Sequence, residues 1–123
     1  MTLDEFVEFC ISKPGVSEHF PFDENTLVFK VMGKMFALTD AENFQSINLK
    51  CEPEMAIELR EKYAAVKPGY HMNKTHWNTI EINSDANDKE IYCWIDNSYN
   101  LILNGLTKNQ KKLFHKQFQS ESK

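Results

Sequence analysis

The sequence predicts an α+β domain with two layers, in which helices cover one face of a largely antiparallel five-stranded sheet. The predicted element order is α-β-β-β-α-β-β-α-α. Three observations support it: apolar residues recur at helical spacing in four segments, alternate at period two in short runs between them, and the connections are short. Neighbouring strands with short connections pair most simply as an antiparallel sheet, whose apolar face helices then bury.

The N-terminal half of the chain predicts one helix followed by a three-stranded meander. A capping box at Thr2 precedes an apolar stripe, so we expect a helix over residues 3–13 that ends at a Pro-Gly pair. A β-branched and aromatic run over 26–38 is interrupted by a glycine, which indicates two strands and a short turn. Residues 45–51 alternate between apolar and polar side chains and predict the third strand.

The C-terminal half predicts three helices and two further strands. Pro53 suits the first turn of a helix with an apolar stripe. Short strands are expected over residues 64–67 and 77–83. Helical spacing resumes over residues 88–104, and a capping box at Thr107 begins a fourth helix.

Size and composition predict one folded domain over residues 1–123, with 41% hydrophobic and 26% charged residues. No segment approaches the roughly 18 apolar residues of a membrane span, so we expect a cytoplasmic protein without membrane association. Cys10, Cys51 and Cys93 are far apart and lack C-x-x-C spacing, which argues against a disulfide framework or a thiolate zinc site. Cys10 and Cys93 are expected to be packing residues.

Charge is distributed unevenly around the formal net charge of −4. Residues 1–25 hold six acids against one lysine, and residues 81–96 hold five acids against one lysine. By contrast, residues 62–74 hold three lysines and residues 107–118 hold four, without an acid in either segment. Such asymmetry can steer a polyanion to one face of an acidic protein. The alternative for the second segment is that its lysines keep a C-terminal helix soluble.

Residues 67–78 form the leading candidate for a functional surface. The segment combines two lysines, two histidines, two aromatic residues and two asparagines around a Pro-Gly break, between two predicted strands. A loop of this composition suits a surface role more than a place in the core.

Five ordered blocks of the sequence carry a family resemblance. They are Pro21-Phe22, FKVMGKMFA at 29–37, NLKCEPE at 48–54, PGYHMNKTHWN at 68–78 and SYNL at 98–101. Together they resemble the MmcQ/YjbR family of small bacterial proteins over nearly the whole chain. The resemblance implies a fold related to CyaY and to type III secretion chaperones, and DNA binding through paired β-hairpins.

DNA is the partner that the residue types of this loop fit best. Lysines contact phosphates, asparagines reach base edges, and rings pack against bases or backbone. The candidates are Lys67, Tyr70, His71, Asn73, Lys74, His76, Trp77 and Asn78, with Lys30, Lys34 and Lys50 extending the basic strip, depending on hairpin register. At most about five or six phosphates could be neutralised, so we expect modest, salt-sensitive affinity. Alternatively, the rings anchor the loop and the asparagines make turns.

A protein-interaction or chaperone-like module is the alternative function. The sheet face without helices would then receive a protein partner or a second copy of the chain. Four phenylalanines bear on this reading, and we expect them to fill the core rather than form a surface patch. They are Phe20, Phe22, Phe29 and Phe36.

Enzymatic and metal-binding readings lack a complete set of residues. His71 and His76 have no nearby acid or thiol in the sequence to complete a zinc site, although His19 or a distant carboxylate could fold in. Cys51 precedes a helix, which can activate a thiol, but it also falls in the inward phase of its strand. We therefore assign no catalytic residue, metal or cofactor.

Overall fold

The computed structural model describes residues 1–119; residues 120–123 of the predicted domain lie outside the described residues. The helices are α1 (Leu3–Ile11), α2 (Pro53–Lys62), α3 (Asp88–Asn104) and α4 (Lys108–Phe114), the last followed by a π-helical turn, η1 (His115–Gln119). The strands are β1 (Val16–His19), β2 (Thr26–Val31), β3 (Lys34–Asp40), β4 (Ser46–Lys50), β5 (Val66–Pro68) and β6 (Trp77–Glu81).

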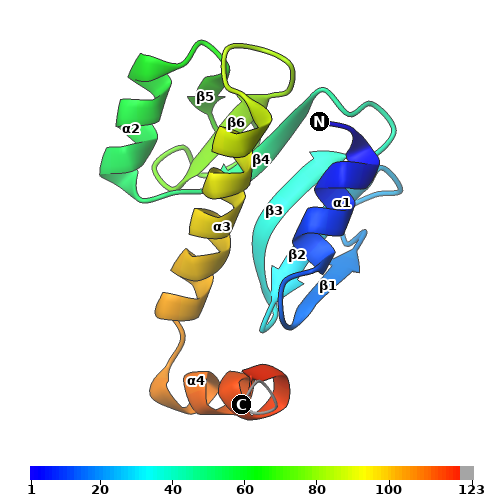
Figure 1. Ribbon diagram of the computed structural model, residues 1–123, viewed down its shortest axis with the longest axis vertical. Helices are drawn as coiled ribbons and strands as arrows, with labels where there is room; N and C mark the ends of the chain where they lie inside the picture. The colour runs from blue at the N-terminus through cyan, green and yellow to red at the C-terminus, as the bar shows by residue number, and fades with distance from the viewer. Residues whose placement is uncertain (120–123) are drawn as a thin grey trace.

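The strands form one antiparallel sheet in the order β1-β2-β3-β4-β6-β5. Helices α1 and α3 lie over one face of this sheet, and α2 packs beside β5 (Figure 1). Helix α4 lies beyond the C-terminal end of α3 (Figure 1). The predicted α+β class, the antiparallel sheet and the four helices are confirmed. Among residues 1–119, no helix has the length and hydrophobicity that crossing a membrane requires.

The predicted strand number and element order are wrong, because β1 was not expected. The sheet has six strands, and β1 follows α1 directly. This strand is only four residues long, and three of its side chains are exposed. A short polar segment carries no alternating pattern to reveal it. Its pairing with β2, which places Val16 opposite Val31, creates it.

The sheet is apolar on both faces, to different extents. On the face under the helices, Phe29, Ile47 and Ile80 join the main core with Phe6 of α1 and Ile95 of α3. Because side chains alternate along a strand, their neighbours point to the other face. On that other face, Val28, Leu38 and Trp77 form a second, smaller cluster.

The phenylalanines divide between core and surface. Phe29 and Phe36 are fully buried, as expected. Phe20 and Phe22 are not in the core, with 51% and 64% of their surfaces exposed, because they lie between β1 and β2 rather than on a strand. The expectation that all four fill the core is therefore wrong for these two.

Candidate functional site

The loop between β5 and β6, residues 69–76, is tied down by its own polar groups. The backbone N–H of Gly69 donates to the Trp77 carbonyl at 2.9 Å, and the Lys74 ammonium donates to the Gly69 carbonyl at 2.9 Å. Asn73 Oδ1 accepts from the backbone N–H groups of Thr75 and His76, the pattern of an Asx turn. A Cβ on Gly69 would lie 2.8 Å from that of Trp77, so the close approach requires glycine. The loop is thus a built structure.

Arg60 of α2 supports the end of this loop from beneath. Its Nε donates to Asn78 Oδ1 at 2.7 Å, and its Nη2 donates to the carbonyls of Lys74 and Trp77. Asn78 is buried and donates in turn to the Ala56 carbonyl at 3.4 Å. Asn78 therefore links helix and loop inside the protein, and its amide is not available to a bound ligand.

Two rings of the loop project outward instead. Tyr70 is 68% exposed, and its ring centroid lies 4.0 Å from that of His71, which is also exposed. His71 has a φ of 59°, in the left-handed region that residues other than glycine seldom adopt. The Tyr70 N–H donates to Thr79 Oγ1 at 2.8 Å, which fixes the start of the loop to β6. The paired rings are held at a defined place above the sheet.

These rings form one wall of a groove of about 580 Å³ on the sheet face without helices. Phe22 is part of the same groove, and its floor includes Asn48 of β4 and Thr79 of β6. The register places Asn48 opposite Thr79, and the Thr79 hydroxyl donates to Asn48 Oδ1. The groove therefore combines exposed rings with a hydrogen-bonding floor.

The charge along the groove is negative rather than positive. Asp23 and Asp40 line it, and its described lining residues include neither lysine nor arginine. Each carboxylate accepts backbone N–H groups of the turn that follows it. Hydrogen bonds from the backbone N–H groups of Thr26, which has the larger effect, and of Asn25 hold the pKa of Asp23 below its usual value. This carboxyl group is therefore ionised at neutral pH.

Lys30 and Lys50 lie on the same sheet face, one alternation further along β2 and β4 from Val28 and Asn48. Both are partly exposed. Lys34 pairs with Val31 and so belongs to the other side of the sheet, at the end of the hairpin. The structure thus brings two of the three predicted strand lysines beside the groove.

The remaining predicted residues divide into engaged and exposed groups. Lys67 forms an ion pair with Glu81 at 2.7 Å, and Lys74 closes its own loop. Trp77 is only 8% exposed and packs in the smaller cluster on the groove side. Asn73 and His76 are exposed at the loop's turn, outside the groove lining.

Metal and thiol chemistry find little support near the loop. Within residues 1–119, no three His, Cys, Asp or Glu side chains gather closely enough to hold a metal ion. Burial raises the pKa of Cys51 to about 11 and that of Cys10 to about 12, so both are thiols rather than nucleophilic thiolates at neutral pH. Cys93 is exposed on α3, contrary to the packing role expected for it.

Comparison with known proteins identifies the family. The YjbR family model matches residues 11–101. The chain belongs to the YjbR family. It is 34% identical over 114 residues to the uncharacterized protein YjbR of Escherichia coli K12, covering 92% of this chain and 97% of that protein. Over 116 residues it is 35% identical to the uncharacterized protein YyaQ of Bacillus subtilis, covering 82% and 98% of the respective chains.

Solved structures extend this family likeness to the fold. The crystal structure of the Deinococcus radiodurans protein DR2400 matches with a TM-score of 0.85 and 37% identity, over 92% of this chain and 87% of that one. A Pseudomonas syringae protein matches with a TM-score of 0.70 and 28% identity, over 82% and 98% of the two chains. The resemblance to the YjbR family expected from the sequence is thereby confirmed.

Sequence reasoning missed most of the groove. Phe22 was expected in the core, and Asn48 and Thr79 were ordinary strand residues until the register placed them side by side. The available signal was their polarity within otherwise apolar strands, which marks the exposed face of a half-buried sheet.

Proposed function

We propose that this YjbR-family protein is a nucleic-acid-binding module that receives an unstacked base of a single strand in the groove. The observation that carries this proposal is the combination of Phe22, Tyr70 and His71 with the Asn48–Thr79 floor. Exposed rings stack on bases, and the partly exposed amide of Asn48, whose Oδ1 is held by the Thr79 hydroxyl, can donate its N–H groups to a base edge. Carboxylates accept hydrogen bonds from the amino groups of bases.

The charge distribution supports a base inside the groove and phosphates outside it. Asp23 and Asp40 repel a phosphate from the groove itself. Lys50 lies two residues along β4 from Asn48 of the groove, and Lys30 lies two residues along β2 from Val28, whose cross-strand partner Leu38 lines the groove. Two residues correspond to roughly 7 Å at the usual rise of a strand. Phosphates flanking a bound base can reach lysines at that distance.

This proposal moves the expected contact from the whole loop to the groove beside it. Lys67 and Lys74 already have partners, and Trp77 and Asn78 are buried. A duplex that bound through these four side chains would have to break their present contacts, whereas a single strand in the groove leaves them intact. We therefore expect single strands to bind more tightly than duplexes.

Fluorescence anisotropy with short labelled single strands and duplexes tests the proposal. Tyr70→Ala should cost about 1–3 kcal/mol of binding free energy, the usual contribution of stacking on one ring. The double variant Lys30→Gln/Lys50→Gln should reduce the salt dependence, because two phosphate contacts to a single strand contribute a slope of about −1.4 in log affinity against log salt. Ile57→Ala and Lys89→Gln, at exposed positions on α2 and α3, are the matched controls.

Two outcomes would overturn the groove proposal. One is the absence of binding to single-stranded DNA and RNA even at about 20 mM salt, where phosphate contacts are strongest. The other is binding that Tyr70→Ala leaves unchanged. Binding that prefers duplexes and is lost in Lys67→Ala and Lys74→Ala would instead support contact by the loop.

A protein partner on the same face is the second candidate function. The exposure of Phe20, Phe22 and Tyr70 favours it, because exposed aromatic side chains are enriched at protein interfaces. The partner could be another protein or a second copy of the chain. A concentration-dependent mass in light scattering that Phe22→Ala abolishes would support self-association. The cytoplasmic location expected from the sequence stays a prediction, which cell fractionation tests.

A further inference from the structure

A second hollow, of about 700 Å³, lies at the corner between the end of α3 and α4, away from the groove. Leu103, Leu106 and Phe114 contribute its apolar lining. Leu106 and Phe114 are buried in the main core, and Leu103 packs against it, so this wall is fixed by the fold. The volume falls within the usual range of small-molecule sites, about 300–1,000 Å³.

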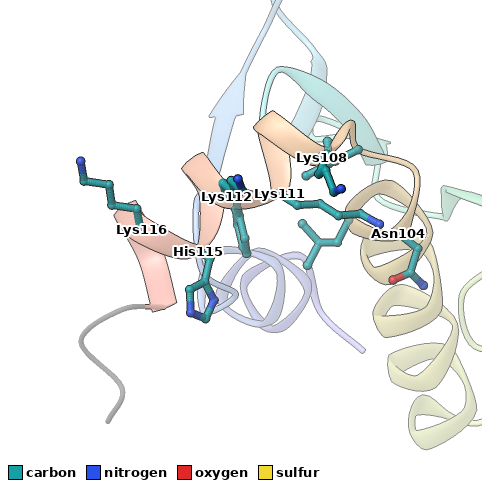
Figure 2. A pocket seen from close by; sticks show the side chains of 9 residues that line it. Asn104, Lys108, Lys111, Lys112, His115 and Lys116 are labelled. Atoms are coloured by element: carbon teal, nitrogen blue, oxygen red, sulfur yellow. The ribbon is translucent and has the colours of Figure 1, made fainter.

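The rim of this hollow is strongly basic. Lys108, Lys111 and Lys112 line it and are exposed. Figure 2 shows Lys111 extending toward Asn104, while Lys116 extends away from both. The ion pairs within residues 1–119 do not involve these three lysines. From Asn97 to Ser120 the sequence contains no aspartate or glutamate.

This pairing of an apolar wall with a cationic rim determines what the hollow can bind. A small inorganic anion would pair with the lysines but leave the exposed part of the apolar wall, chiefly Leu103, in water. An uncharged alkyl chain would cover the wall but leave the lysines without a counter-charge. A molecule with an anionic head and an alkyl body satisfies both, and lysine stems can themselves pack along an alkyl chain.

We propose that the α3–α4 corner binds a monomeric anionic amphiphile, a straight-chain carboxylate of the fatty-acid type. Its carboxylate lies among Lys108, Lys111 and Lys112. Its alkyl chain lies against Leu103 and the apolar wall. The site is independent of the groove and of the nucleic-acid proposal.

Isothermal titration of the full chain with octanoate, decanoate and dodecanoate, each below its micelle concentration, tests the alkyl contact. Each added pair of methylenes should raise the affinity roughly tenfold for as long as the chain stays on the wall. Decanol should bind at least about fivefold more weakly than decanoate, because it lacks the charge that the lysines attract.

Charge-removing variants test the rim. Lys108→Gln/Lys111→Gln should lower decanoate affinity about tenfold and reduce its salt dependence, because Lys112 alone of the three then remains. Neither replaced lysine belongs to an ion pair within residues 1–119. Lys89→Gln, an exposed lysine on the first turn of α3, should leave the affinity unchanged. Amide chemical shifts should move at Leu103, Leu106 and Phe114, and Tyr70→Ala should not alter them.

Three results would overturn this site. The first is an affinity that is the same for octanoate, decanoate and dodecanoate, or a decanoate affinity that the double lysine variant leaves unchanged. The second is a set of shifted amides around Phe22 and Tyr70 rather than the α3–α4 corner. The third is association with anionic vesicles without any binding of monomeric decanoate, which would assign the lysines to a membrane surface.

Discussion

The two lysine-rich segments of the chain, residues 62–74 and 107–118, differ in what their ammonium groups contact. In the first, Lys67 pairs with Glu81 on the neighbouring strand, and Lys74 binds a carbonyl of its own loop. In the second, Lys108 and Lys111 form none of the ion pairs within residues 1–119. Lysine density in a sequence therefore does not measure the charge available to a partner. Some lysines already bind a carboxylate on a neighbouring strand or a carbonyl of their own loop.

Two aromatic residues, Tyr70 and Trp77, also differ in whether they are engaged within the protein or exposed. Trp77 begins β6 and packs against Val28 and Leu38, whereas Tyr70 projects from the loop with 68% of its surface exposed. One ring stabilises the floor of the site, and the other is available to a ligand. Their neighbours in sequence would not separate these roles.

Replacing each ring in turn gives the largest expected contrast. Trp77→Ala should lower the free energy of unfolding by about 3–5 kcal/mol, because it empties the centre of the smaller apolar cluster. Tyr70→Ala should change it by no more than about 0.5 kcal/mol, as is usual at exposed positions. Urea unfolding followed by circular dichroism measures both. Similar losses for the two variants would show that Tyr70 also supports the fold.

Removing the support beneath the loop should have the next largest effect. Arg60→Met removes the donor to Asn78 Oδ1 and to the Lys74 carbonyl, whereas the Trp77 carbonyl keeps its hydrogen bond from the Gly69 N–H. The variant should cost about 2–3 kcal/mol, mainly because Asn78 is buried and water cannot readily replace its lost hydrogen bond. Lys62→Met, on the same helix, is the control, and we expect it to cost less than about 0.5 kcal/mol. Equal costs would contradict the assigned role of Arg60.

Neutralising the two sets of lysines compares the segments directly. Lys67→Met should lower the free energy of unfolding by about 0.2–1 kcal/mol, a difference that shrinks as salt is added, because its ion pair is exposed. Lys74→Met should cost about 0.5–1.5 kcal/mol, since it removes one hydrogen bond from the loop. Lys108→Met and Lys111→Met should change stability by no more than about 0.5 kcal/mol. A larger loss at either position would reveal an internal role for α4 lysines.

The fold was largely predictable because its signals are local. Capping boxes at Thr2 and Thr107 and the Pro53 start mark helices at positions where the structure begins them. The hairpin break falls at Met32-Gly33, where both residues have positive φ. Strand β1 was not predicted because it depends on pairing with β2, and its own residues carry no strand pattern.

The site was less predictable because it depends on register and on partners. Asn78 and Asn73 are both asparagines of one segment, yet one is buried under Arg60 and the other caps an exposed turn. Whether Lys30 and Lys34 share a face is decided by pairing across a hairpin with an irregularity after Phe29. Composition identified the segment beside the groove, but side-chain direction required the structure.

The smallest predicted effect concerns Asp23, at the edge of the groove. Hydrogen bonds from the Thr26 and Asn25 N–H groups lower its pKa, so its contribution to stability is fully present above the unfolded-state value near 3.8. The contribution is lost as the pH falls through the lower folded-state pKa. The stability difference between wild type and Asp23→Asn should therefore be largest near neutral pH and vanish in strong acid. Urea unfolding across this range measures it, with Glu24→Gln as the neighbouring exposed control. A difference that grows on acidification would show that the carboxylate is held protonated, and phosphate exclusion from the groove would then need another cause.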